Sequence, residues 1–422
     1  MAERGGGGGS TTPRAVIRTY LVLLLGNTLC ASLIWGINTI FLLDAGLTNL
    51  EAFAANAFFT LGMVLFEIPT GVVADTIGRR VSYLLGTVTL SVTTLLYVLL
   101  WWLGAPFWAW ALVSVLLGLG FTFFSGATEA WLVDALAATG YTGTLETVFG
   151  RGQVVAGLAM LTGSLGGGFL AQWTNLGVPF VLRGAILLLM FGVAWRLMRD
   201  IGFTPRPGGR PLAEASRVLR ASVDHGWRRP VVRWLMLEAF FAAGVGFYVF
   251  YALQPHLLEL LGDPRAYSVA GLVAAIVAGS QVLGGLAAAR VGRAFRRRTS
   301  ALLALSAASV VTLALIGAVR SFAAVLGLVV VWGLLSAAAT PVRRAYLNGL
   351  IGSGQRATVL SFDSLVGSAG GAWTQPVLGR AADVWGYGGS FMLGAGIAAL
   401  ALPFLALSRR ERADADRTDG PR

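Results

Sequence analysis

The sequence predicts an all-α polytopic membrane protein, with twelve transmembrane helices in two pseudo-symmetric six-helix bundles. Composition, the recurrence of apolar runs and a duplicated motif predict this class. Of the 422 residues, 56% are hydrophobic and 12% are charged, and the mean hydropathy is +0.73. A soluble chain of this length could not bury so much apolar surface. The apolar runs are long enough to cross roughly 30 Å of hydrocarbon as helices, and none alternates as a β-barrel strand would.

The apolar runs form two sets of six around a polar break. Residues 1–16 include five consecutive glycines and are expected to form a disordered cytoplasmic tail. The first bundle, 17–198, is expected to contain spans at 17–43, 50–74, 81–103, 106–134, 147–172 and 178–198. The break at 199–230 is expected to be a cytoplasmic linker, with an amphipathic surface helix at 212–223. The second bundle, 231–408, is expected to contain spans at 231–253, 268–289, 300–319, 322–342, 357–378 and 387–408, followed by a cytoplasmic tail at 409–422.

The arginines predict the orientation in the membrane. All 32 basic residues are arginines, and they fall on one side of the expected spans except for Arg183, Arg265, Arg320 and Arg380. Loops rich in arginine remain in the cytoplasm, so that side and both termini are assigned to the cytoplasm. We therefore expect a multi-pass protein of the cell inner (plasma) membrane.

Several function classes are excluded by composition. The net charge of +12 does not indicate nucleic-acid binding, because the arginines lie in short loops between apolar runs. Cys30 is the single cysteine, so no intrachain disulfide can form. His225 and His256 are too few for a metal site. No Ser/His/Asp set or nucleotide-binding loop is present, so we expect no enzyme and no cofactor.

A motif at the end of the second expected span recurs in the second half of the chain. Residues 71–80 read Gly-x-x-x-Asp-x-x-Gly-Arg-Arg, and 285–293 keep the glycine spacing but have Ala289 in place of Asp75. A second pair, Gly-Ser-x-Gly-Gly, occurs at 163–167 and 367–371. Two ordered matches favour a duplicated unit over chance, and glycine-dense helices of this kind let backbones approach closely.

On these residues the chain resembles the major facilitator superfamily. Its signature loop is matched by Gly71, Asp75, Gly78, Arg79 and Arg80. The twelve spans and the central linker extend the resemblance over the whole chain, and residues 66–75 with 125–134 look like a drug-exporter branch. The resemblance implies a major facilitator fold, a monomer, and a central cavity lined by the first, fourth, seventh and tenth helices.

The signature loop is expected to act as a gate on the cytoplasmic side. Asp75 can accept hydrogen bonds from the start of a facing helix or pair with Arg79, and Gly71 permits close packing. Asp134 ends the fourth span at the same depth and is an expected partner for Arg79 or Arg80. The alternative is a surface salt bridge worth roughly 0–1 kcal/mol. Because the motif matches at every key position, we favour the gate.

Three acids inside the expected spans are candidates for proton coupling: Glu67, Glu129 and Glu238. An ionised carboxylate inside a membrane is costly, so each should face a cavity or carry a proton. Burial raises the pKa of a carboxyl group, which would bring proton exchange near neutral pH. The alternative is a structural bond to a neighbouring helix or to Arg151, and Asp363 is expected to be structural in this way.

Polar and aromatic side chains of the cavity-lining spans are candidates for substrate contact. They are Asn27, Trp35, Asn38, Trp131, Phe247, Tyr251 and Trp332, together with Gln281, which the repeat sets opposite Glu67. Aromatic rings near a carboxylate suit a lipophilic cation. Packing or lipid contact explains any single aromatic residue equally well.

Together these features predict a secondary active transporter that works by alternating access. The expected function is multidrug efflux: a proton-coupled exporter (antiporter) of small amphipathic or cationic molecules, with the proton gradient as its energy source. The alternative is a proton symporter that takes up a polar metabolite, since intramembrane acids serve either direction. A transporter-like receptor or scaffold is less favoured, because it would need neither the motif nor the acids. The expected partners are a small-molecule substrate, protons and the lipid bilayer.

Overall fold

The computed structural model describes residues 12–205, 227–351 and 356–418, and these form helices and no sheet. One isolated backbone bridge joins Arg297 to Arg417. Ten helices are long and apolar enough to cross a membrane among the described residues. The last of them, Val359–Arg410, is 52 residues long and holds both of the final two expected spans. The surface helix expected at 212–223 lies outside the described residues.

The helices form a first and a second group along the chain. The first group consists of α1 (Pro13–Trp35), α2 (Asn38–Asp44), α3 (Asn49–Thr76), α4 (Arg79–Leu103), α5 (Phe107–Thr122), α6 (Ala127–Ala138), α7 (Leu145–Trp173) and α8 (Gly177–Leu197). The second consists of α10 (Pro230–Leu261), α11 (Tyr267–Ala294), α12 (Arg298–Ala318), α13 (Phe322–Leu350), α14 (Arg356–Ala399), α15 (Ala401–Arg410) and the 3-10 helix η3 (Asp414–Asp416).

The helix bounds differ from the expected spans in ways that have local causes. The side chain of Thr12 caps α1 and a proline follows it, so the helix begins inside the tail expected at 1–16. The fourth span is divided into α5 and α6 before Gly126, which has φ +66°. The helix α14 runs through the expected end of the eleventh span, and Gly386, at φ 70°, marks the break instead.

Two helices continue past the expected ends of their spans, and each contains a proline. The helix α10 contains Pro255 and ends at Leu261 instead of 253, and α13 contains Pro341 and ends at Leu350 instead of 342. Membrane helices tolerate proline because neighbouring helices satisfy the freed backbone groups. The extension of α13 places Arg343 inside a helix.

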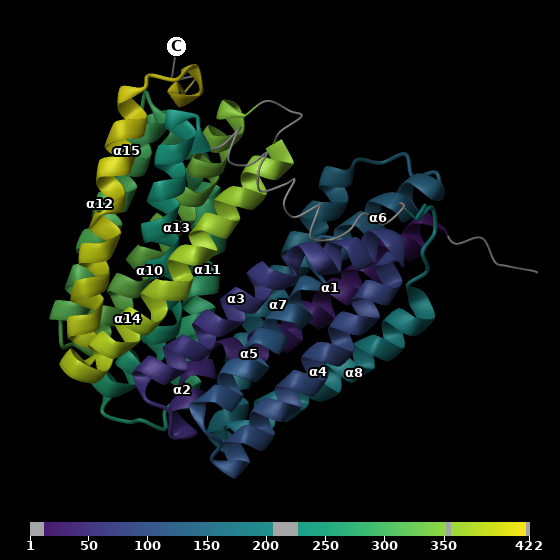
Figure 1. The fold of residues 1–422 in the computed structure, drawn as a ribbon, viewed down its shortest axis with the longest axis horizontal. Coiled ribbons are helices and arrows are strands. Elements are labelled where there is room, and N and C mark those ends of the chain that lie inside the picture. The colour runs from purple at the N-terminus through teal and green to yellow at the C-terminus, as the bar shows by residue number, and fades with distance from the viewer. Residues whose placement is uncertain (1–11, 206–226, 352–355, 419–422) are drawn as a thin grey trace, which may run out of the picture.

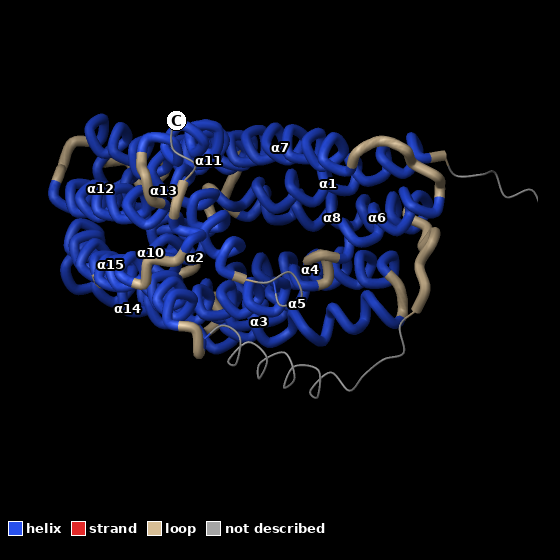
Figure 2. The backbone as a smooth tube through the Cα atoms, turned by 90° about the horizontal axis from the view of Figure 1, so that it is seen from above, coloured by secondary structure: helices blue, strands red, loops and turns tan. Residues whose placement is uncertain are grey.

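The two groups of helices diverge from one end of the molecule to the other. Figure 1 shows them close together near α2 and apart at the end where α1 begins and α15 finishes, here called the termini side. The most extensive contacts between the groups are made by α3 with α14 and by α7 with α11. In Figure 2 these pairs lie along opposite edges, with α2 and α10 between them.

The repeated glycine motif packs in the same way in each group. Gly167 of α7 lies so close to α1 that a Cβ there would overlap the carbonyl oxygen of Leu33. Gly370 of α14, one motif position earlier, makes a similar approach to the carbonyl oxygen of Phe240 on α10, the helix that corresponds to α1. The expectation that these glycines bring backbones together is therefore confirmed, and it positions the helices next to the centre of the molecule.

Candidate functional site

The signature loop forms an ion-pair cluster within the first group, on the termini side. Nη1 of Arg79 lies 2.9 Å from Oδ1 of Asp75, and its Nη2 lies 3.9 Å from Oδ2 of Asp134. The guanidinium of Arg79 also lies 5.8 Å from the ring centre of Phe203. Asp134 stands at the C-terminal part of α6, so Arg79 ties the end of α3 to the end of α6.

Arg80 connects the same loop to the end of α8. Its backbone N–H donates to Oδ1 of Asp200 over 3.0 Å, and its side chain donates to the carbonyl oxygen of Trp195. The guanidinium also lies 4.8 Å from the ring centre of Trp195. Burial raises the pKa of Asp200, although the Arg80 N–H and the two guanidinium groups act in the opposite direction. Asp200 carries no signature of its own in the sequence.

The two glycines of the loop have different surroundings. Gly78 is the N-cap of α4 with φ +131°, and a Cβ there would overlap Oδ2 of Asp200. No described atom lies within 4 Å of the position of a Cβ on Gly71. The close packing expected at Gly71 is therefore not found against the described residues.

Replacing Gly78 by alanine is expected to destabilise the loop by about 1–3 kcal/mol, since alanine must adopt a positive φ and displace Asp200. Thermal unfolding of the purified variant measures this. Gly71→Ala is the matched control, because the described surroundings leave space for its methyl group. Equal melting temperatures of the two variants would contradict the assigned role of Gly78.

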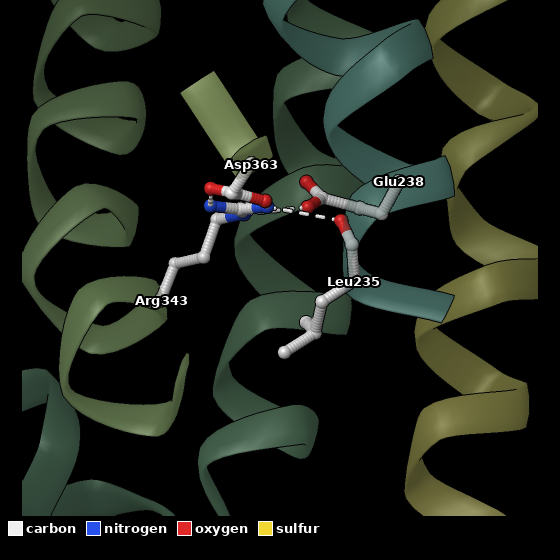
Figure 3. Close-up of polar contacts among 4 residues, drawn as sticks. All are labelled: Leu235, Glu238, Arg343 and Asp363. Atoms are coloured by element: carbon white, nitrogen blue, oxygen red, sulfur yellow. Dashed lines mark hydrogen bonds and ion pairs between the residues drawn. The ribbon is translucent and has the colours of Figure 1, made fainter. Parts of the chain in front are cut away.

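A second charge cluster, the carboxylate–arginine triad, lies in the second group (Figure 3). Nε of Arg343 donates to Oε2 of Glu238 over 2.7 Å. The two Nη atoms of Arg343 each donate to one carboxylate oxygen of Asp363, both over 2.7 Å. The carbonyl oxygen of Leu235 accepts a further bond of 2.9 Å. The triad thus joins α10, α13 and α14. It contains two carboxylates and one guanidinium, so one carboxylate is in excess.

The triad corrects two expectations from the sequence. Glu238 is not an isolated buried acid, because Arg343 lies 2.7 Å from its carboxylate and donates to it. Arg343 is not a loop residue, because α13 continues through Pro341.

Glu67 and Glu129 are exposed instead of buried. The side chain of Ser125 donates to Oε1 of Glu67 over 2.7 Å, which connects α3 to the turn before α6. Glu129 lies in the first turn of α6. Both acids therefore face space outside the protein core, and a carboxylate at membrane depth in such a position needs water or a proton.

On the side opposite the termini, Asp383 of α14 caps the start of α3 in the other group. Its Oδ1 accepts from the N–H of Asn49 and its Oδ2 from the N–H of Leu50, each over 2.9 Å. An anion at a helix N-terminus is stabilised by the free N–H groups and the helix dipole. The hydroxyl of Tyr387 also donates to the side chain of Asn49. We call the pair of bonds from Asn49 and Leu50 the Asp383 cap.

Further contacts between the groups occur on this same side. Nε2 of Gln254 donates to the carbonyl oxygen of Trp35 over 2.6 Å. The rings of Trp35 and Phe250 meet edge to face at 6.4 Å. Among the described residues, every hydrogen bond that joins the two groups lies on the side away from the termini.

Some of the expected cavity residues lie between or beside the groups. Phe247 is 42% exposed, and a Cβ on Gly371 of α14 would lie 2.8 Å from its ring. Tyr251 is half-buried on α10. Oδ1 of Asn27 accepts a 2.8 Å bond from the hydroxyl of Tyr83. Among the described residues, no three His, Cys, Asp or Glu side chains gather as a metal would require.

The structure contradicts the cavity assignment for three residues. Trp131 is buried in the core of the first group and donates to the carbonyl oxygen of Arg199. Asn38 is buried and donates over 3.0 Å to Asn56. Trp332 belongs to the buried apolar core of the second group. The side chain of Gln281 lies outside the described residues.

Arg183 is the largest departure from the expected orientation of a side chain. The arginine distribution assigns it to the outer side, near the start of the expected span 178–198, but it lies inside α8 and is 2% exposed. Its guanidinium lies 5.8 Å from the ring centre of Phe121. The apolar run 178–198 contains Arg183, and this was the available signal that the residue is within the membrane.

A helical membrane protein with two equivalent groups of helices, whose hydrogen bonds to each other among the described residues lie on one side, has the architecture of a transporter built from a duplicated unit. The chain belongs to the major facilitator superfamily of secondary transporters: the family model described as Major Facilitator Superfamily matches residues 20–314. No curated protein matches the sequence.

Solved structures share the fold at low sequence identity. The nucleoside transporter NupG has a TM-score of 0.75 at 11% identity, over 93% of this chain and 98% of that one. A bacterial homolog of the human lysosomal transporter Spinster, in an inward-facing and unoccupied conformation, has a TM-score of 0.73 at 16% identity, over 98% of this chain and 100% of that one. The POT family transporter PepTSo has a TM-score of 0.71 at 13% identity, over 94% and 98%. The predicted major facilitator fold is thereby confirmed.

Proposed function

We propose that this protein is a proton-coupled antiporter that exports small amphipathic or cationic molecules by alternating access. The observation that carries the proposal is the one-sided distribution of contacts between the two groups of helices. The Asp383 cap and the Gln254 bond hold the groups together on one side. Transport would require these contacts to break while new ones form on the termini side.

The arginine distribution supports placing the termini side in the cytoplasm. In that orientation the conformation is open to the cytoplasm, in the inner membrane, and the expected monomer contains the complete pathway. The charged contacts of the signature loop with Asp134 and Asp200 lie within the first group, so the second group is left free to approach.

The two sides of the protein would close in turn, each by an aspartate that accepts hydrogen bonds from the start of a helix in the other group. On the outer side, Asp383, which shortly precedes the break in α14 at Gly386, caps the start of α3. On the cytoplasmic side, Asp75 near the end of α3 is proposed to accept from the start of α14 when that side closes. In the present conformation the carboxylate of Asp75 pairs with Arg79.

Glu67 and Glu129 are the proposed proton carriers, and Glu238 is assigned to the triad. An exposed acid at membrane depth can exchange a proton with cavity water, whereas the charge of Glu238 is held by Arg343. Aromatic rings such as Phe247 near such acids support amphipathic or cationic substrates.

Replacing Glu67 or Glu129 by glutamine is expected to abolish transport driven by a pH gradient, since an amide cannot take up a proton. Exchange of labelled for unlabelled substrate should persist, because it needs no net proton movement. Both rates can be measured in proteoliposomes with and without an imposed gradient. If both single variants keep full gradient dependence, neither residue carries the proton.

Export is tested with inverted membrane vesicles that contain the protein. Ethidium and a panel of amphipathic drugs are added outside, and accumulation is compared with and without an uncoupler. Accumulation that collapses with the pH gradient supports export by antiport. Gradient-driven uptake of a polar metabolite into right-side-out vesicles would instead select the proton symporter.

A further inference from the structure

Arg183 is a buried cation without an anionic partner among the described residues. It is 2% exposed, and its Nε has no hydrogen-bond partner. The titratable side chains close enough to act on its charge are Cys30, Tyr97 and Tyr251, none of which has a carboxyl group. By contrast, Arg343 in the carboxylate–arginine triad has two carboxylate partners.

Such an arrangement is costly for a purely structural residue. A guanidinium cannot lose its proton in a protein, so it cannot escape its charge by burial. Arg183 lies about 9 Å along α8 from Gly177, and its low exposure shows that the side chain does not extend into solvent. Replacing an unpaired buried charge by an apolar side chain commonly stabilises a protein. The position therefore calls for a role other than stability.

The surroundings of Arg183 belong to both groups of helices. Phe121 of α5 and Tyr97 of α4 come from the first group, while Tyr251 of α10 comes from the second. One turn beyond Tyr251, Gln254 is buried with its Oε1 unpaired. Each group thus contributes a buried, unsatisfied polar atom, Nε of Arg183 in the first and Oε1 of Gln254 in the second.

We infer that Arg183 binds the anionic group of the substrate, a carboxylate attached to an apolar or aromatic body. Its fork of N–H donors matches a carboxylate, and the adjacent aromatic rings suit the apolar body. This inference rests on the transport function proposed above and narrows the substrates to amphipathic molecules with an anionic group. A cation without such a group would be repelled by Arg183 at this position.

Binding of radiolabelled benzoate and octanoate to the detergent-purified protein tests the inference by equilibrium dialysis. The wild type is expected to bind both saturably and to prefer benzoate over neutral benzamide. Arg183→Met should lose about 10–100-fold in affinity for both anions, and Arg183→Lys should lose less because it keeps the charge. Arg265→Gln is the matched control, since Arg265 is exposed in a loop. Absence of saturable anion binding by the wild type, or Arg183→Met affinities within twofold of wild type, would overturn the assignment.

Thermal unfolding of the same variants provides a second test, because a purely structural role of Arg183 and the inferred binding role predict opposite changes in melting temperature. Arg183→Met is expected to melt at a higher temperature than wild type, because an uncompensated buried charge is removed. A lower melting temperature would show that Arg183 stabilises the fold, against the inference.

The binding assay needs no gradient and no transport, so its failure is distinct from failure of the proposed function. A protein that exports any drug of the panel in vesicles but binds benzoate equally well without Arg183 refutes only the substrate assignment. A protein that binds benzoate through Arg183 but moves no substrate refutes only the transport proposal.

Discussion

Replacing Arg343 by glutamine is expected to lower the thermal melting temperature of the detergent-purified protein by on the order of 10 °C. The substitution leaves the carboxylates of Glu238 and Asp363 next to each other without their shared cation. Removing one partner from a buried ion network costs about 3–5 kcal/mol, because the remaining charges are uncompensated. Three helices lose their connection at the same time, so the second group should loosen as a unit.

Two variants serve as controls for this effect. Arg344 is exposed and adjacent in sequence, so Arg344→Gln should change the melting temperature very little. The triple variant Arg343→Gln, Glu238→Gln, Asp363→Asn has no charge left unpaired and should recover most of the loss. If Arg343→Gln melts like wild type, the triad does not hold the three helices together.

Replacing Asp383 by alanine is expected to shift the conformational equilibrium toward the state that is open on the side opposite the termini. The variant loses both bonds of the Asp383 cap, together worth about 2 kcal/mol at this exposed position. That difference corresponds to a roughly 30-fold change in the ratio of the two states. Transport should slow, because the outer side closes less often in each cycle.

A cysteine at position 270 reports this shift. Ala270 is fully buried where α11 packs against the first group, so Ala270→Cys in a Cys30→Ala background should react slowly with a membrane-impermeant maleimide. Asp383→Ala should accelerate that reaction from the outer side. Glu51→Gln is the matched control, because Glu51 caps α3 only from within its own group. An unchanged labelling rate in Asp383→Ala would exclude the cap as a closing contact.

Features that repeat or run over many residues were predictable from the sequence. The spans follow from apolar length, and the two copies of the glycine motif pack in equivalent places in the two groups. The ion pair between Arg79 and Asp75 was expected from the signature motif, in which the two residues flank Gly78 at the junction of α3 and α4.

Features that depend on one residue and its distant neighbours were not predictable. Arg343 was assigned to a loop because the expected span ends at 342, but α13 continues to Leu350. Glu238 has the same sequence surroundings whether it is paired or alone, and its partner is 105 positions away. Trp131 looks like a cavity residue by type and helix, but the rotation of α6 turns it into the core.

The sequence by itself determined that this is a duplicated, twelve-span membrane protein of the major facilitator superfamily, because apolar length and a local motif are properties of contiguous residues. Only the tertiary structure decided which charges are compensated. Arg343 meets two acids, Asp383 meets the start of a helix in the other group, and Arg183 meets none among the described residues. The reason is physical: the cost of a charge in a membrane depends on what lies within a few ångströms of it, and those neighbours come from other helices.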